Sequence, residues 1–343
     1  MKVGIMGAGS LGTIIGALIT DGGQAVDLID AYEENVKALN NNGARITGLI
    51  NKTVSVNAIT PDQMSGEYDL VFLLTKQVYN SEALNQLLPH LHSESVVCTL
   101  QNGVPEDYVS EMIGKERTVG GVVGFGATWK EPGISELTTA WDVVQKYAFD
   151  IGELDGRITP RIEEISEILG LIGHCEVSDN ILGMKWSKLL MNSTFSGMSA
   201  ALGCTFGDVL YNEKAMYSLA HIADETIKVA HALGINMVPM QGENFEFLEL
   251  EDEADIPNKM GFYNEVWKPH EKLKASMLQD LEKNKKTEID YINGYVSQKG
   301  RIVGVKTPYN DLVVKLVNKA EEQHYVPKFS VNIECFDTIK ADI

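Results

Sequence analysis

The chain has 343 residues, of which 44% are hydrophobic and 22% charged, a composition typical of a globular protein long enough for about two domains. Its 29 Lys and Arg residues against 48 Asp and Glu residues give a formal net charge of -19, which argues against nucleic acid and anionic membrane surfaces as partners. The four cysteines are widely spaced, without a CxxC pair or a cluster with His, so we expect reduced thiols and no metal site.

The N-terminal residues read directly as a strand, without a charged leader or a cleavage site. No apolar run reaches the roughly 18 residues that a membrane span requires. We therefore expect a soluble, cytoplasmic protein.

A glycine-rich turn follows the first predicted strand, Met1 to Met6. It has the sequence Gly7-Ala8-Gly9-Ser10-Leu11-Gly12 and precedes an apolar helical pattern from Thr13 to Thr20. In a dinucleotide-binding turn, the first glycine permits the tight turn, the second lets the backbone approach a pyrophosphate, and the third lets helix and strand pack closely. The free N–H groups at the helix N-terminus would hold the anion, so we predict cofactor contacts from Gly7, Gly9, Ser10, Leu11 and Gly12.

A second strand is predicted over 25–30, which completes the start of a βαβ unit. Asp30 ends this strand, where an acidic side chain hydrogen-bonds the adenosine ribose of NAD. The alternative is a solvent-exposed carboxylate at a strand end.

After a helical pattern from Glu33 to Asn41, short alternating runs over 44–59 indicate a small antiparallel excursion. Buried strands are then predicted over 69–76 and 95–100. Ligands of open α/β sheets bind at the carboxyl ends of the strands. Lys76 ends the first of these strands with Gln77 after it, and Gln101-Asn102-Gly103 follows the second, so both groups are expected at one edge of the sheet, although Asn-Gly is also a common turn sequence.

Further strands are predicted over 118–128 and 148–152, and the pattern is strand-rich up to about residue 177. Beyond it, helical periodicity dominates, over 181–202, 216–233, 272–284, 287–299 and 308–322. The predicted fold is therefore α/β, with an N-terminal Rossmann-type doubly wound sheet over residues 1–177 and an all-α C-terminal domain over 178–343.

An acidic segment that contains two aromatic residues runs from Gly242 to Asp255. It is interpreted as an ordered insertion, a mobile lid or a solvated acidic loop.

The predicted helix over 181–202 carries polar side chains suited to carbonyl chemistry. Lys188 and Asn192 are four residues apart and so share one helix face, beside apolar neighbours. A partly desolvated lysine has a lowered pKa, which suits a general acid, whereas a lone lysine on a surface helix usually extends its amine into solvent.

Two later motifs place Ser276 and Glu288 on neighbouring predicted helices. Acidic residues early in a helix are also typical of an ordinary helix start, so spacing alone does not assign Glu288 a role.

Taken together, these motifs resemble those of the ketopantoate reductase (2-dehydropantoate 2-reductase) family, in the 6-phosphogluconate-dehydrogenase-like superfamily. The resemblance covers nearly the whole chain. It is carried by the glycine turn, Lys76, 101–103, 149–153, 186–192, Ser276-Met277-Leu278-Gln279-Asp280 and Thr287-Glu288-Ile289-Asp290-Tyr291-Ile292-Asn293-Gly294.

The resemblance implies a role for each matching residue. Lys188 is implied as the proton donor to the ketone oxygen, and Glu288 as a catalytic residue beside the reaction centre. Lys76 and Asn102 are implied to line the cofactor and substrate crevice. Asn192 and Ser276 are implied to hold the substrate, Ser276 near its carboxylate.

Three departures from the family pattern bear on cofactor and substrate. Asp30-Ala31 stands where NADPH-using members carry a small residue followed by Arg; an acidic group repels a 2′-phosphate, so NAD(H) is favoured over the family's usual NADP(H). Leu273 stands three residues before Ser276, where ketopantoate reductases can carry a substrate-binding Asn, and an apolar side chain cannot hydrogen-bond a substrate hydroxyl. The segment between Lys188 and Ser276 is also longer than in short family members.

The expected function is reduction of a small-molecule 2-keto acid, ketopantoate or a similar branched acid, to the D-2-hydroxy acid by an enzyme that is a monomer or homodimer. One alternative is an NADH-dependent D-2-hydroxyacid dehydrogenase that acts on other branched or aromatic 2-keto acids. An alternative of another class is a protein that senses NAD(H) without catalysis.

Overall fold

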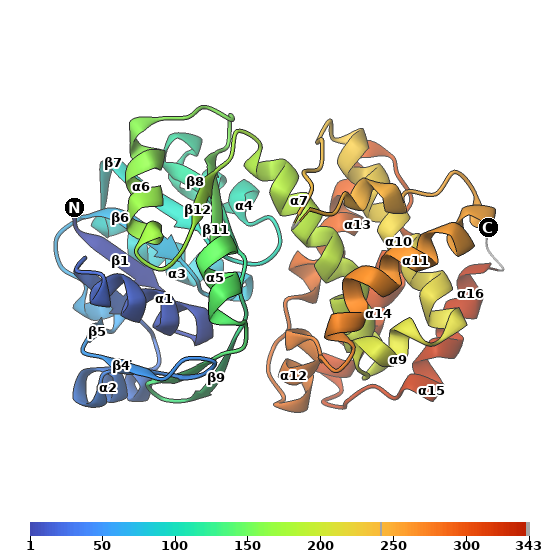
Figure 1. Ribbon diagram of the computed structural model, residues 1–343, viewed down its shortest axis with the longest axis horizontal. Coiled ribbons are helices and arrows are strands. Elements are labelled where there is room, and N and C mark those ends of the chain that lie inside the picture. The colour runs from blue at the N-terminus through green and yellow to red at the C-terminus, as the bar shows by residue number, and fades with distance from the viewer. Residues whose placement is uncertain (241, 341–343) are drawn as a thin grey trace. The chain divides into compact units, whose positions relative to one another are not determined.

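The computed structural model describes residues 1–240 and 242–340, in two compact units, Met1–Leu182 and Gly183–Ile343 (Figure 1). The division falls inside the helix that carries Lys188. Among the described residues, no helix combines the length and apolar character that a membrane crossing requires.

The first unit is built on an eight-stranded sheet in the order β12-β11-β8-β7-β6-β1-β2-β5. All neighbouring strands are parallel except β8 and β11. The strands are β1 Val3–Met6, β2 Val26–Ile29, β5 Asn57–Ile59, β6 Tyr68–Leu73, β7 Leu91–Thr99, β8 Thr118–Val123, β11 Phe149–Glu153 and β12 Cys175–Val177. The predicted α/β architecture with a Rossmann-type sheet is confirmed.

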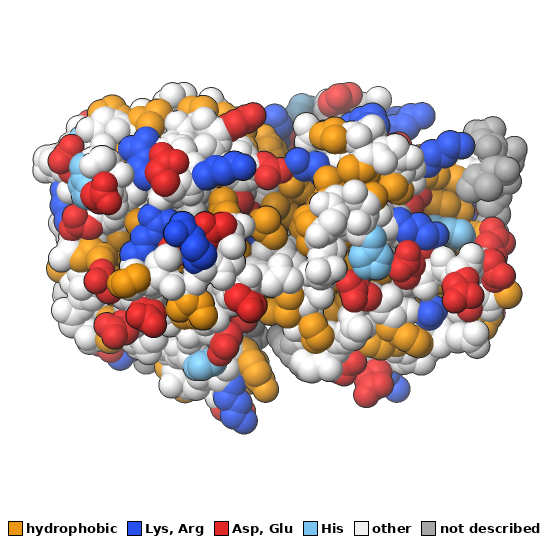
Figure 2. Space-filling view, turned by 90° about the horizontal axis from the view of Figure 1, so that it is seen from above, with side chains coloured by type: hydrophobic (Ala, Val, Ile, Leu, Met, Phe, Trp, Pro, Cys, Tyr) orange, Lys and Arg blue, Asp and Glu red, His pale blue; other side chains and the backbone are white. Residues whose placement is uncertain are grey.

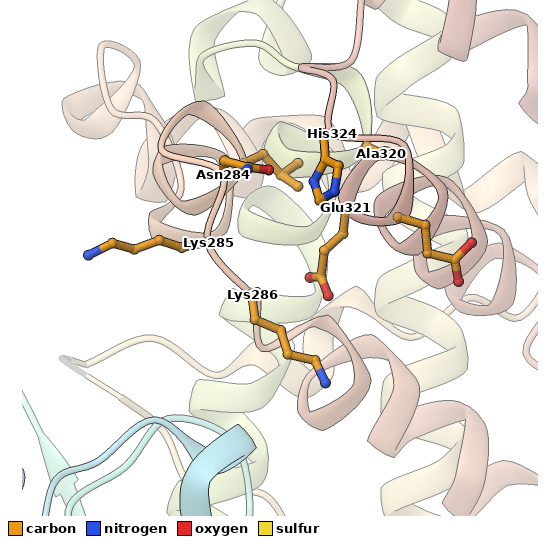
Figure 3. Close-up of a pocket in the computed structure, with 8 residues that line it drawn as sticks. Asn284, Lys285, Lys286, Ala320, Glu321 and His324 are labelled. Atoms are coloured by element: carbon orange, nitrogen blue, oxygen red, sulfur yellow. The ribbon is translucent and has the colours of Figure 1, made fainter. Parts of the chain in front are cut away.

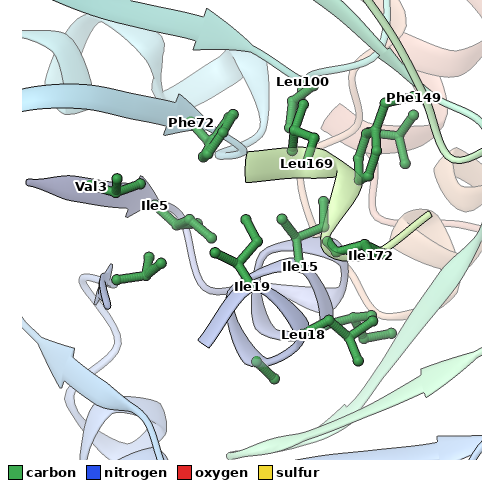
Figure 4. Packing of buried hydrophobic residues seen from close by; sticks show 14 of the residues in the cluster. Val3, Ile5, Ile15, Leu18, Ile19, Phe72, Leu100, Phe149, Leu169 and Ile172 are labelled. Atoms are coloured by element: carbon green, nitrogen blue, oxygen red, sulfur yellow. The ribbon is translucent and has the colours of Figure 1, made fainter. Parts of the chain in front are cut away.

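Helices cover both faces of this sheet, as the alternation of side chains along buried parallel strands requires. Val3 and Ile5 of β1 face one way and pack, with Phe72 of β6, against Ile15 and Ile19 of α1 (Figure 4). Met6 faces the other way, in a cluster with side chains of α3 and α4. The helices are α1 Ser10–Asp21, α2 Glu33–Asn42, α3 Asn80–Leu87, α4 Glu106–Ile113, α5 Trp141–Tyr147 and α6 Pro160–Gly170.

A second, four-stranded sheet in the order β4-β3-β10-β9 packs beside α1. Its strands are β3 Ala44–Gly48, β4 Lys52–Val54, β9 Ala127–Glu131 and β10 Ile134–Leu137. The expected antiparallel excursion over 44–59 is therefore only partly right, because β3 and β4 are antiparallel whereas β5 joins the large sheet in parallel with β2.

The segment 118–128, expected as one strand, is two strands in different sheets. β8 ends at Val123, and β9 begins at Ala127 after a turn that contains Gly124 and Gly126. A Cβ at Gly124 would lie 1.8 Å from the Tyr147 carbonyl oxygen, so this backbone approach is open only to glycine.

The second unit is helical. The predicted segment 181–202 is one continuous helical run, in which a π-helical turn, Asn192–Ser196, separates α7 from α8. Its helices are α7 Ile181–Met191, α8 Gly197–Leu202, α9 Phe206–Leu210, α10 Glu213–Ala232, α11 Ile256–Trp267, α12 Ser276–Glu282, α13 Asn293–Val303, α14 Pro308–Glu322, α15 Phe329–Asn332 and α16 Asp337–Lys340.

The helix expected over 287–299 is shorter than predicted. Glu288 precedes a 3₁₀ turn, Ile289–Tyr291, and α13 begins only at Asn293. Ile292, between them, has φ -109° and ψ -93°, which is not a helical conformation, so the chain changes direction there. The helix expected over 272–284 likewise begins only at Ser276.

The acidic segment 242–255 is ordered by its apolar side chains. Phe245, Leu248 and Leu250 are buried, and Phe245 packs edge-on against Trp267 of α11. The Asp224 carboxylate accepts a hydrogen bond from the Leu250 backbone N–H at 2.8 Å. These contacts fit an ordered insertion better than a solvated loop.

Candidate active site

The glycine turn after β1 has the geometry that a pyrophosphate requires. Gly7 has φ +103°, and a Cβ there would lie 2.6 Å from the backbone nitrogen of Thr75. At Gly12 a Cβ would lie 2.0 Å from the Gly7 carbonyl oxygen, whereas at Gly9 it would meet no atom within 4 Å from the described residues other than its chain neighbours. Gly7 and Gly12 are therefore required by the protein's own packing, and Gly9 leaves its space to something outside the chain.

The N-terminus of α1 is open to an anion. Gly9 caps the helix without a side-chain hydrogen bond, and the first turn contains no acidic residue. Ser10 and Leu11 are partly exposed. Free N–H groups and the positive end of the helix dipole favour a phosphate there, so the residues present fit a dinucleotide.

Asp30 lies directly after β2, beside the glycine turn. Its Oδ1 accepts a hydrogen bond from the Tyr32 backbone N–H at 2.8 Å, and its Oδ2 accepts one from Asn35 Nδ2 at 3.3 Å. Burial raises the pKa of the Asp30 carboxyl above its ordinary value, although these hydrogen bonds and one from the Ala8 backbone favour the charged form. Asp30 is thus a partly buried, oriented acceptor rather than a free strand-end carboxylate.

Lys76 and Asn102 follow the neighbouring parallel strands β6 and β7, as predicted from their positions after those strands. Both are partly buried. β6 also pairs with β1, so Lys76 lies past the strand next to the glycine turn. The order of strands reverses there, which is where open α/β sheets bind ligands.

Three buried amides, Gln77, Asn80 and Gln101, fix the backbone between these two residues. Gln77 Nε2 donates to the Asn102 carbonyl oxygen at 2.5 Å. Gln101 Nε2 donates to the Thr75 carbonyl oxygen and to Asn80 Oδ1, each at 2.6 Å. The sequence indicated Gln77 and Gln101 only as residues near a strand end, because their partners lie about 25 residues away.

In the second unit, Lys188 lies on α7 and Asn192 begins the π-helical turn. Both are partly buried. The Asn192 Nδ2 atom is buried and has no hydrogen-bond partner among the residues that the structure describes. An unpaired buried donor costs free energy, and π-helical turns occur frequently at functional sites. Asn192 is therefore a donor that a ligand can satisfy.

Ser276 and Glu288 are tied by buried hydrogen bonds to the helical run that carries Lys188 and Asn192. The backbone N–H of Ala275, just before Ser276, donates to Ser199 Oγ at 3.1 Å. Asn293, which follows the Glu288 turn, donates through Nδ2 to the Ser193 carbonyl oxygen at 2.9 Å. The start of α12 is thus joined to α8, and the segment after Glu288 to the π-helical turn that Asn192 begins.

Asn293 belongs to a buried network that the sequence did not indicate. Its Nδ2 also donates to Asn310 Oδ1 at 2.9 Å, and Asn310 Nδ2 donates to the Glu225 carboxylate at 2.7 Å. A Cβ at Gly197 would lie 2.6 Å from Asn293 Oδ1, so the end of the π-helical turn needs a glycine. No local pattern could have revealed this network, because its members lie on four separate segments.

Lys185 is a second lysine of α7 that sequence reasoning missed. Only 1% of its surface is exposed, less than for Lys188. The apolar neighbours Met184 and Trp186 were a sign in the sequence that Lys185 is buried. A lysine between two apolar residues is, however, too common a pattern to predict burial by itself.

A pocket of about 320 Å³ lies between the end of α12 and the end of α14 (Figure 3). None of the predicted site residues lines it. Glu321 accepts a hydrogen bond from the Thr287 backbone N–H at 2.7 Å, and the Lys285 side chain extends away from His324 (Figure 3). The lining residues are Leu281, Asn284, Lys285, Lys286, Ala320, Glu321, Glu322 and His324.

Comparison with known families covers both units. Residues 3–153 match the model of ketopantoate reductase PanE/ApbA, and residues 180–321 match that of its C-terminal domain. The chain is 32% identical to the 2-dehydropantoate 2-reductase of Pyrococcus horikoshii over 94% of its own length and 98% of that protein. It belongs to the ketopantoate reductase family.

Other relatives agree with this assignment. The 2-dehydropantoate 2-reductase of Archaeoglobus fulgidus is 30% identical over 93% of the chain and 98% of that protein. As a member of this family, the chain is an NAD(P)-dependent reductase.

Among solved structures, a D-mandelate dehydrogenase with NADH and anilino(oxo)acetate superposes with a TM-score of 0.81. It is 25% identical and covers 94% of this chain and 99% of that one. A ketopantoate reductase from Ralstonia eutropha has a TM-score of 0.79 at 24% identity, covers 94% and 99% of the two chains, and supports the fold.

Proposed function

We propose that this family member reduces a 2-keto acid, ketopantoate or a similar branched acid, to the D-2-hydroxy acid, and that it uses NADH in preference to NADPH. The observation that carries the substrate assignment is the buried, unpaired Nδ2 of Asn192, one helical turn from Lys188. A ketone or carboxylate oxygen would accept from this donor.

The dinucleotide would be held by the backbone of Gly7 to Gly12, by Asp30 and by the strand-end residues Lys76 and Asn102. When bound, NADH supplies the hydride that reduces the keto carbon. Asp30 would accept hydrogen bonds from the adenosine ribose hydroxyls, and its charge would repel a 2′-phosphate.

At the substrate, the Lys188 ammonium group would donate its proton to the ketone oxygen as negative charge develops there. The C=O π bond becomes a C–H and an O–H bond, and Lys188 regains its proton from solvent. Asn192 and Ser276 would bind the substrate, Ser276 its carboxylate, and Glu288 would lie beside the reacting atoms.

A substitution at Lys188 tests the proton-donor assignment. Lys188→Ala should lower kcat by roughly 10²- to 10⁴-fold, since that is what a general acid contributes. Lys315→Ala, at an exposed lysine of α14, is the control and should keep wild-type turnover. Near-normal turnover of a folded Lys188→Ala enzyme on its best keto acid would refute the role.

A second candidate function, an NADH-dependent D-2-hydroxyacid dehydrogenase for other branched or aromatic acids, is favoured by Leu273. This apolar side chain, 51% exposed, stands three residues before Ser276, where members of the family can carry an Asn. The D-mandelate dehydrogenase similarity supports the same candidate.

Steady-state kcat/KM values separate the candidates. Ketopantoate, 2-ketoisocaproate and phenylglyoxylate are each assayed with NADH and with NADPH. Preference for ketopantoate or a similar branched acid supports the first function, and preference for phenylglyoxylate supports the second. NADH binding without turnover of any 2-keto acid would instead support a protein that senses NAD(H) without catalysis.

A further inference from the structure

Asn35, in the first turn of α2, is a buried polar side chain that no predicted role uses. It is 2% exposed. Its Nδ2 donates to the Ala8 carbonyl oxygen of the glycine turn at 2.9 Å and to Asp30 Oδ2 at 3.3 Å. Its Oδ1 accepts from the Gly133 backbone N–H at 2.8 Å. One amide therefore joins the glycine turn, Asp30 and the β9–β10 hairpin.

This arrangement fixes the orientation of the Asp30 carboxylate. Each carboxylate oxygen has a different donor, the Tyr32 backbone for Oδ1 and the Asn35 side chain for Oδ2. Rotation about the Asp30 side chain would break at least one of these bonds. Because an ionised carboxylate accepts about four hydrogen bonds, acceptor capacity remains for a ribose hydroxyl.

The chain segment that follows Asp30 supplies no free positive charge that would offset its carboxylate. From Asp30 to Asn42 the acidic residues are Asp30, Glu33 and Glu34, and the only basic residue, Lys37, pairs with Glu33 at 2.9 Å. A 2′-phosphate at Asp30 would thus meet an oriented negative charge without a neighbouring cation from α2 to offset it.

We propose that Asn35 is a positioning residue for cofactor discrimination, which holds the Asp30 carboxylate toward the adenosine ribose and thereby separates NADH from NADPH. This role rests on the proposed use of NADH. Without Asn35, the Asp30 carboxylate can turn away from the ribose. The hydrogen bond to the NADH ribose is then weakened, and so is the repulsion of the NADPH 2′-phosphate.

Direct binding of NADH and NADPH, measured by quenching of protein fluorescence, tests the proposal in a double-mutant cycle. The proteins are wild type, Asn35→Ala, Asp30→Ser and the double variant. In Asn35→Ala, the ratio Kd(NADPH)/Kd(NADH) should fall about tenfold, the scale of one hydrogen bond to a charged group. In the Asp30→Ser background, loss of Asn35 should not change the ratio further.

Asn40→Ala is the matched control. Asn40 lies on the same helix and also makes two hydrogen bonds, to the Ala58 carbonyl oxygen at 2.7 Å and from the Ala58 N–H at 2.9 Å. Its loss should lower the melting temperature but leave the Kd ratio unchanged. If Asn35→Ala does not fold, Asn35→Ser replaces it, since a serine hydroxyl is too short to bridge the same three groups.

Two results would overturn the proposal: equal weakening of both cofactors in the Asn35 variant, as for a purely structural role, or a change in the ratio that persists without Asp30. A failure of the proposed NADH preference can be told apart from a failure of the role of Asn35. It needs only the wild-type protein, in which the ratio Kd(NADPH)/Kd(NADH) would be at or below one. That result would also remove the basis for this role of Asn35.

Discussion

Gly9 and Gly12 belong to the same turn but differ in the space available where a side chain would begin. A Cβ at Gly9 would meet no atom within 4 Å from the described residues beyond its own chain neighbours, whereas a Cβ at Gly12 would meet a carbonyl oxygen of its own turn. Gly12 is therefore required by the fold, whereas we propose that Gly9 is required by the cofactor. The same contrast applies in the second unit, where the Asn192 Nδ2 atom has no partner among the described residues and the Asn293 Nδ2 atom donates to the Ser193 carbonyl oxygen.

This contrast predicts opposite outcomes for two alanine substitutions. Gly9→Ala should change the free energy of unfolding by less than about 1 kcal/mol, since Gly9 has φ -72° and alanine is only a weaker helix cap. It should nevertheless weaken NADH binding at least tenfold, because the new methyl group lies where the backbone approaches the pyrophosphate.

Gly12→Ala should instead destabilise the protein strongly, by roughly 1–3 kcal/mol or more, because its Cβ would lie 2.0 Å from a backbone oxygen that cannot rotate away. Urea unfolding and NADH titration of both variants check the pair. Unimpaired NADH binding by Gly9→Ala would contradict the assignment of the turn.

At the scale of elements, a buried glutamate of α10, Glu225, caps the N-terminus of α14. The Glu225 carboxylate accepts hydrogen bonds from the backbone N–H groups of Tyr309 and Asn310 at 2.9 and 3.0 Å, where Thr307 makes no side-chain cap. Burial, together with the nearby Asp311 charge, raises the pKa of Glu225 to about 8 despite these donors.

The raised pKa predicts a pH dependence of stability. The folded protein holds the Glu225 proton more tightly than the unfolded chain, so this contribution is complete below the ordinary glutamate pKa and is lost as the pH rises toward about 8. The free energy of unfolding should therefore fall between about pH 5 and pH 8, by at most about 1.4 kcal/mol per pH unit from this group.

Urea unfolding at a series of pH values measures that fall. In Glu225→Gln the fall should be smaller than in wild type, whereas Glu322→Gln, at an exposed glutamate near the end of α14, should keep the wild-type profile. Parallel profiles for wild type and Glu225→Gln would show that Glu225 does not titrate in this range.

At the scale of the whole molecule, a net charge of -19 is distributed over a surface on which basic and acidic side chains are interspersed on the face seen in Figure 2. An anionic cofactor and an anionic keto acid must therefore be held by local groups rather than attracted by net charge. The N-terminus of α1 and Lys188 are the groups that we propose for these roles, and they belong to different units of the chain.

Cofactor binding should be visible in the stability of the whole protein. A ligand that binds only the folded state at 100 times its Kd adds about 2.7 kcal/mol to the free energy of unfolding. Saturating NADH should therefore raise the melting temperature by several degrees, and an equal concentration of NADPH should raise it less. A larger rise with NADPH would contradict the preference assigned to Asp30.

The sequence by itself determined the features that local physical chemistry encodes. The glycine spacing located the tight turn between β1 and α1, because only glycine tolerates the backbone approaches at Gly7 and Gly12. Helical periodicity located the run 181–202 and α14 Pro308–Glu322, because an amphipathic face repeats along one segment.

Only the tertiary structure decided how distant segments combine. The pairing of β3 with β10, the contact of Asn35 with Gly133 and that of Asn293 with Ser193 join residues about 90 to 100 positions apart. A strand's alternation does not specify its partner, and an asparagine that is to be buried looks in sequence like one in a turn. Such contacts depend on which surfaces meet after the chain folds, so the groups that orient Asp30 and the Glu288 turn were not predictable from local sequence.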